Sequence, residues 1–138
     1  MSSEVKRKAI AMTKSFLEHV NITVSDPIAT ASRLSDWFDW HVRWQGAARA
    51  GGTTVHVGTD DSYIAVYSFG NTNATKEDTY ATHGSLNHVG VVVGDLDAVE
   101  KKVLAGGYKT RNPGDYEPGR RFYFDDDDGI EFEVVSYA

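Results

Sequence analysis

The sequence predicts an α+β fold made of two βαβββ modules, a curved mixed sheet around a cleft with the helices on the outside. Three observations carry this prediction. A segment at residue 19 recurs at residue 88, and each copy is followed by one helical period and then by short strand-like runs. The chain has 138 residues, 41% of them apolar, which suffices for one domain with one proper core.

The repeat aligns residues 19–29 with residues 88–98 at a constant offset of 69 residues. A His, two Val, an Asp and an Ala coincide in this window. Each copy consists of an alternating apolar run, an aspartate and a helical period. The aspartates, Asp26 and Asp95, are predicted N-caps. The predicted apolar stripes are Ile28, Ala31, Leu34 and Phe38 in the first helix, and Leu96, Val99 and Val103 in the second.

Short runs separated by turn residues follow each helix and are predicted as strands. They cover residues 42–44, 53–58 and 63–69 in the first half, and 108–110, 120–124 and 130–137 in the second. Residues 1–15 are predicted to be an N-terminal leader, 16–69 the first module, 70–85 a linker and 86–138 the second module. Tyr80 is the only large apolar residue of that linker.

Composition excludes several classes of function. The net charge of −6 gives no electrostatic attraction to nucleic acid or to anionic membranes. No apolar run approaches the roughly 20 residues that span a bilayer. The chain has no cysteine, so a disulfide or a thiolate-bound metal is excluded and any metal must be held by His and carboxylate. We therefore expect a cytoplasmic protein with no nucleic-acid or membrane partner.

Strand alternation places His and Glu on one side of the predicted sheet. In the first strand His19 points away from the apolar face of Val20 and Ile22, because side chains alternate along a strand. In the last strand Glu131 and Glu133 point away from the helix-facing apolar set. The side of the sheet that the helices leave open is therefore expected to carry His and Glu.

These features resemble the vicinal oxygen chelate superfamily, which includes glyoxalases, bleomycin-resistance proteins and extradiol dioxygenases. The resemblance rests on the two-fold repeat, the His that opens each unit and the closing run from Phe122 to Glu133, and it covers about residues 16–137. It implies metal ligands at the positions of His19, Ala65, His88 and Glu133. Ala65 cannot bind a metal, so the four-ligand pattern of the glyoxalase I lyases is broken. The resemblance then implies a divalent ion (Fe²⁺, Mn²⁺, Zn²⁺ or Ni²⁺) on two His and one Glu.

The resemblance leaves two metal-dependent branches open. Two His and one carboxylate leave coordination positions for a substrate with adjacent oxygens and for O₂, as in extradiol dioxygenases, which the chain also resembles at Tyr123. Residues 114–116 stand where those enzymes carry a further His. Fosfomycin-resistance thiol transferases use the same ligand positions with Mn²⁺, but here the chain ends five residues after Glu133.

We therefore expect a divalent-metal-dependent enzyme, dioxygenase-like or lyase-like, that acts on a small molecule with vicinal oxygens. The expected ligands are His19, His88 and Glu133, and the expected catalytic residue is Tyr123, a donor of a hydrogen bond or proton. The alternative is a metal-free protein of the bleomycin-resistance type that sequesters a ligand. Exposed sheet edges also predict a homodimer, and the cleft could form within one chain or between exchanged halves of two.

Overall fold

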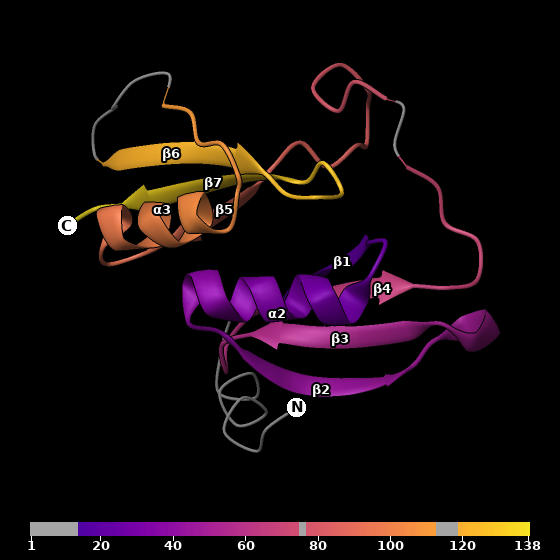
Figure 1. Cartoon of the computed structure of the whole chain (residues 1–138). Helices are drawn as coiled ribbons and strands as arrows, with labels where there is room; N and C mark the ends of the chain where they lie inside the picture. The colour runs from indigo at the N-terminus through magenta and orange to yellow at the C-terminus, as the bar shows by residue number, and fades with distance from the viewer. Residues whose placement is uncertain (1–13, 75–76, 113–118) are drawn as a thin grey trace. The chain divides into compact units, whose positions relative to one another are not determined.

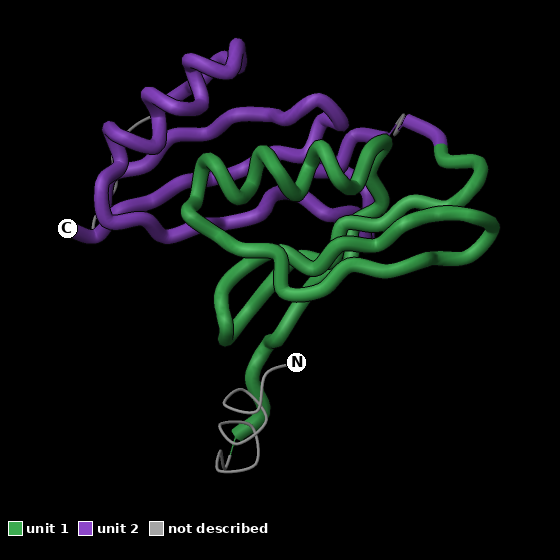
Figure 2. The backbone as a smooth tube through the Cα atoms, turned by 60° about the horizontal axis from the view of Figure 1, so that its bottom comes forward, with its two compact units in different colours: residues 1–72 green, residues 73–138 purple. Residues whose placement is uncertain are grey.

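The computed structural model describes residues 14–74, 77–112 and 119–138. The chain divides into two compact units, residues 1–72 and residues 73–138 (Figure 2). The described part contains seven strands and two α-helices, and each unit has one mixed sheet with one helix. The predicted α+β fold with a repeated module is thereby confirmed. Most of the predicted leader, residues 1–13, lies outside the described residues.

Unit 1 is a four-stranded sheet covered by one helix (Figure 1). The strands follow the order β1-β4-β3-β2, with β1 parallel to β4 and the other pairs antiparallel. Helix α2 packs on β3, β4 and β2. In chain order the elements are β1 (His19–Thr23), α2 (Pro27–Phe38), β2 (His41–Ala47), the 3-10 turn η1 (Arg49–Gly51), β3 (Thr53–Gly58) and β4 (Tyr63–Ser68).

The start of α2 follows the predicted capping chemistry. Asp26 Oδ1 accepts the backbone N–H of Ala29 at 3.1 Å, and Pro27 stands in the first turn. The predicted apolar stripe was wrong at one position, because Ile28 is exposed. Pro27 is buried in its place, so the buried face of the helix begins one residue earlier than predicted. The buried positions of the helix are Pro27, Thr30, Ala31, Leu34, Trp37 and Phe38.

Unit 2 is a three-stranded sheet in the order β5-β7-β6, packed against one helix (Figure 1). Strand β5 runs parallel to β7, and β6 pairs antiparallel with β7. The predicted N-cap Asp95 is confirmed, since its side chain accepts the N–H of Ala98. Among the described residues of the chain, no helix is long and apolar enough to cross a membrane. The elements are β5 (Val89–Val92), α3 (Leu96–Ala105), β6 (Arg120–Asp125) and β7 (Glu131–Ser136).

The strand predicted at residues 108–110 was wrong. The chain there is irregular, and only Arg111 pairs with β6, through two backbone hydrogen bonds to Tyr123 of 2.9 and 2.8 Å. The side chains explain the difference. Tyr108 packs on Phe124 in the core, and Thr110 donates its hydroxyl to Glu100 of α3 at 2.5 Å. The side chains of these residues are therefore held by α3 and by the core and not by pairing with a strand. Over the described residues, unit 2 is βαββ.

Candidate functional site

His19 and His88 hold equivalent places in the two units, at the start of the edge strand that runs parallel to the closing strand. His19 is the first residue of β1 and pairs in register with Tyr63 of β4. His88 directly precedes β5, whose Val89 pairs with Phe132 of β7. This equivalence follows from the 69-residue repeat.

In unit 2, His88 and Glu133 are in direct contact. His88 Nε2 lies 3.0 Å from Glu133 Oε2, and both side chains are partly buried. The other ring nitrogen, Nδ1, lies 2.8 Å from Asn87 Oδ1 and 3.9 Å from Glu131 Oε1. Both ring nitrogens therefore face acceptor oxygens, Nδ1 those of Asn87 and Glu131 and Nε2 that of Glu133.

At 3.0 Å, His88 Nε2 and Glu133 Oε2 are close enough to share a hydrogen bond or to hold a metal ion between them. Glu133 is also held on its other side, because Arg121 Nη1 lies 2.8 Å from its Oε1 and only 15% of each side chain is exposed. The carboxylate is thus fixed in orientation, with one oxygen on Arg121 and the other on His88.

Glu131, two residues earlier on β7, belongs to a different network. Its Oε2 lies 2.5 Å from Arg111 Nη2, and its Oε1 accepts the hydroxyl of Tyr80. That hydrogen bond raises the pKa of Tyr80 to about 12, so Tyr80 keeps its proton at neutral pH. Arg111 also pairs with Asp125 at 3.1 Å. The two glutamates therefore have different arginine partners, although they point to the same side of the sheet and both lie within 4 Å of His88.

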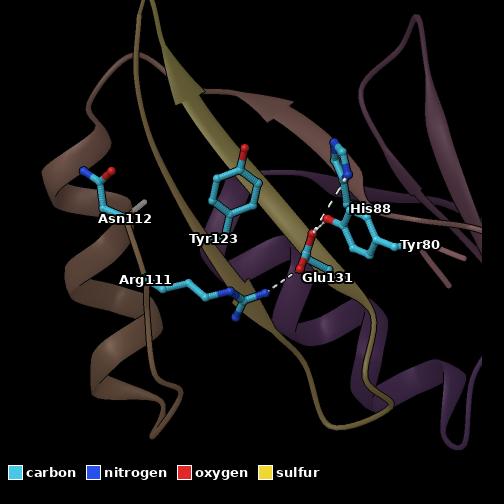
Figure 3. A pocket seen from close by; sticks show the side chains of 6 residues that line it. All are labelled: Tyr80, His88, Arg111, Asn112, Tyr123 and Glu131. Carbon is cyan, nitrogen blue, oxygen red and sulfur yellow. Dashed lines mark hydrogen bonds and ion pairs between the residues drawn. The ribbon is translucent and has the colours of Figure 1, made fainter. Parts of the chain in front are cut away.

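A cavity of about 510 Å³ lies over this network. Figure 3 shows Glu131 between Tyr80 and His88 on one side and Arg111 on the other. Burial, and next the nearby Glu133 carboxylate, raise the pKa of Tyr123, whose phenol therefore keeps its proton and acts as a hydrogen-bond donor. All of the lining residues belong to unit 2: Tyr80, His88, Arg111, Asn112, Tyr123 and Glu131.

His19 has a comparable arrangement in unit 1. Its Nδ1 lies 2.9 Å from Glu18 Oε1, so Nε2 is the ring nitrogen turned away from Glu18. The ring stacks on Tyr63 with centroids 4.8 Å apart, and the Tyr63 hydroxyl donates to the same Glu18 oxygen. His56 stacks on Tyr63 as well, at 4.6 Å. Glu18 and Tyr63 together fix the plane of the His19 ring.

His56 gives unit 1 a predicted pH dependence. Burial, and next the proximity of His19, lower the pKa of His56 below its usual 6.5. Below pH 6.5 the unfolded chain therefore binds this proton more readily than the folded one, and stability falls as the pH drops through the folded-state pKa. Replacing His56 with Gln is expected to flatten this part of the profile. Urea unfolding at pH 8 and pH 5 tests this, with the fluorescence of the three tryptophans, all in unit 1, as the signal. The same difference in unfolding free energy between the two pH values in the parent and in His56→Gln would contradict the prediction.

Of the four predicted site residues, unit 2 brings His88, Glu133 and Tyr123 together, and His19 lies in unit 1. Tyr123 is the register partner of Glu133 and meets the His88 ring edge-on. Among the described residues, no three His, Asp or Glu side chains form a group that could hold a metal ion. Residues 114–116, where the sequence departs from the dioxygenase pattern, lie outside the described residues.

Sequence reasoning missed three residues of the cavity, Tyr80, Arg111 and Asn112. Tyr80 lies in the predicted linker, where its position as the one large apolar residue was the available signal. Arg111 follows the misassigned strand and gave no signal, because its partners are 14 and 20 residues away. At the start of β6, Arg120 pairs with Asp97 and Arg121 with Glu133.

Comparisons with known proteins agree on the family and the fold. The family model of the Glyoxalase/Bleomycin resistance protein/Dioxygenase superfamily matches residues 16–134. Among solved structures, a glyoxylase/bleomycin resistance protein/dioxygenase domain from Frankia sp. EAN1pec has a TM-score of 0.75 and 20% identity, covering 90% of this chain and 98% of that one. No protein with a curated function matches the chain.

Two further similar structures differ in what their names state. The fosfomycin resistance protein FosX from Listeria monocytogenes, complexed with Mn(II) and sulfate, has a TM-score of 0.69 and 20% identity, covering 90% of this chain and 93% of its own. An antibiotic binding protein from Streptomyces sp. CB03234 has a TM-score of 0.65 and 16% identity, covering 92% and 99%. At these identities the likeness concerns the fold.

Proposed function

This chain belongs to the Glyoxalase/Bleomycin resistance protein/Dioxygenase superfamily, and on that premise we propose that it is a divalent-metal-dependent enzyme acting on a small substrate with vicinal oxygens. The proposed ligands are His88 and Glu133 from unit 2 and His19 from unit 1. Tyr123 is the proposed donor of a hydrogen bond or proton. Related proteins such as FosX bind Mn(II), which supports a divalent ion of this kind.

The observation that carries the proposal is the contact between His88 Nε2 and Glu133 Oε2. Their separation of 3.0 Å suits two ligands of one ion, because metal–nitrogen and metal–oxygen bonds are each about 2.1 Å long. The orientation of the imidazole also fits. A ligand histidine usually donates its second ring N–H to a nearby oxygen, and such an oxygen lies beside Nδ1 of both residues, Asn87 Oδ1 for His88 and Glu18 Oε1 for His19.

A bound ion would supply Lewis acidity and a template for two adjacent substrate oxygens. The chain's own residues supply the rest. Tyr123 keeps its proton next to Glu133 and can donate it to an oxygen that gains negative charge. Tyr80, Arg111 and Glu131 form a polar wall that is already hydrogen-bonded, so a ligand can enter without leaving these groups unpaired.

Metal content tests this proposal directly. Protein purified without chelator and without added metal is expected to contain close to one divalent ion per chain, measured by inductively coupled plasma mass spectrometry. After chelation, Mn²⁺ should bind again in isothermal titration calorimetry. The absence of metal in both measurements would overturn the proposal. Iron in the purified protein would favour oxygen chemistry, manganese the transferase branch, and zinc or nickel a lyase or isomerase.

A second candidate is a metal-free protein that sequesters a ligand, and the pairing of Arg121 with Glu133 favours it. The guanidinium already neutralises the carboxylate that would have to attract a divalent ion. In that case the carboxylate stays engaged with Arg121 and His88. Tight binding of a small molecule by metal-free protein, unchanged by added Mn²⁺, would support this candidate. The homodimer and the cytoplasmic location stay predictions.

A further inference from the structure

Gly90, in the middle of β5, has no structural reason to be glycine within unit 2. Its φ is not among the positive values found at four other glycines, so any L-residue can adopt its backbone conformation. A Cβ built on Gly90 meets no atom of the described residues of unit 2 within 4 Å. The equivalent position in unit 1 is Asn21 of β1, which shows that this strand position accepts a side chain.

Glycine inside a strand is costly, because it loses more conformational freedom on folding than other residues and contributes no packing. In strands it often marks a place where a ligand or another backbone comes close. The space over Gly90 is therefore kept open at a cost to the stability of β5, which indicates that something outside this unit uses it.

The open space borders the proposed site. Tyr123 of β6, Glu133 of β7 and Gly90 of β5 are register partners and form one row across the sheet. His88 and Val92 lie on the same side of β5 as Gly90, because side chains alternate along the strand. Val92 is 65% exposed there. The row thus leads from the cavity residue Tyr123 across the Glu133 carboxylate to an open, partly apolar surface.

We propose that Gly90 is a specificity-determining residue: the ligand held beside Glu133 extends over Gly90, and the size of residue 90 limits the ligands that fit. This inference rests on the proposed function, since it concerns the ligand of the same site. The polar end of such a ligand lies at His88 and Glu133, and an apolar or aromatic part lies on Gly90 and Val92. A larger residue at position 90 would exclude bulky ligands and spare small ones.

The test uses the full chain and 4-nitrocatechol, a coloured aromatic probe with vicinal oxygens, titrated with and without Mn²⁺. Gly90→Val is expected to weaken binding of the probe by about tenfold or more, since a badly fitting group in a pocket costs a factor of this order. Gly90→Ala should have a smaller effect in the same direction. Affinity for Mn²⁺ alone should stay within about twofold of the parent, because a Cβ at position 90 meets no atom within 4 Å and the two proposed ligands of unit 2 are unchanged.

Gly94→Val is the matched control, because Gly94 also has an ordinary φ and an open Cβ position but lies after the end of β5. It should bind the probe like the parent. Equal binding by the Gly90 and Gly94 variants, or no binding by the parent in either condition, would overturn the inference. So would a changed association state of Gly90→Val in light scattering, since a second copy would then occupy the space. If the parent binds the probe equally well with and without Mn²⁺, the proposed metal is contradicted. The comparison of the parent with Gly90→Val still tests the role of position 90 in that case.

Discussion

Replacing Glu133 with Gln is expected to lower the affinity for Mn²⁺ by about 100-fold or more while leaving the chain folded. Changes next to a metal ligand typically cost about 10–100-fold in affinity, so loss of a direct anionic ligand should reach at least the upper end. Gln has nearly the same shape, and its amide oxygen can still accept the hydrogen bond from Arg121. Isothermal titration calorimetry measures the affinity, and circular dichroism checks the fold.

Glu131→Gln is the matched control, because both glutamates lie on β7 and point to the same side of the sheet. Glu131 is already bound by Arg111 and Tyr80, so its replacement should change the Mn²⁺ affinity by only about threefold. Two results would contradict the assignment of Glu133: a Glu133→Gln variant that binds Mn²⁺ like the parent, or a larger loss in Glu131→Gln. The first result together with ligand binding by metal-free protein would favour the sequestering candidate.

Removing the metal is expected to affect folding only through binding. Phe132 and Val134 of β7 are fully buried on the face opposite Glu133, so the core of unit 2 forms without an ion. The contribution of a bound ion is then RT ln(1 + [L]/Kd), about 2.7 kcal/mol at a hundredfold excess over Kd. The protein should therefore remain folded when the metal is chelated, which is why the variants above can be compared in the folded state.

The repeat and the local signals made most of the fold predictable. Asp26 and Asp95 cap helices at the predicted residues, and the strand at 53–58 has its predicted bounds. These features depend on residues within a few positions of one another, which is the range that a pattern covers. Strand β2 is longer than predicted at both ends, because pairing with β3 extends it over Gln45, Gly46 and Ala47. Pairing of this kind is not visible in the composition of a single segment.

The site could be predicted only where the repeat marks it. The 69-residue offset marked His88, and the family resemblance implied Glu133, whose strand parity agrees; these two side chains contact each other. The partners that surround them come from distant segments: Tyr80 precedes Glu131 by 51 residues, and Arg111 precedes it by 20. Side chains of this kind meet only after the sheet has formed, so no local pattern reports them.

Phe124→Ala is expected to destabilise unit 2 by about 3–5 kcal/mol, the usual cost of removing a fully buried phenylalanine. Phe124 is 0% exposed, and its ring stacks on Phe132 with centroids 5.3 Å apart and on Phe122 at 6.1 Å. Truncation removes the central ring of this row and leaves a cavity that the β6–β7 pair cannot close, because both strands are fixed by their ladder of hydrogen bonds. Urea unfolding followed by far-UV circular dichroism measures the loss.

Leu104→Ala is the control, because Leu104 is at an exposed position of α3. It should change the free energy of unfolding by less than about 0.5 kcal/mol. A loss for Phe124→Ala as small as that for Leu104→Ala would mean that the aromatic row does not form the core of unit 2.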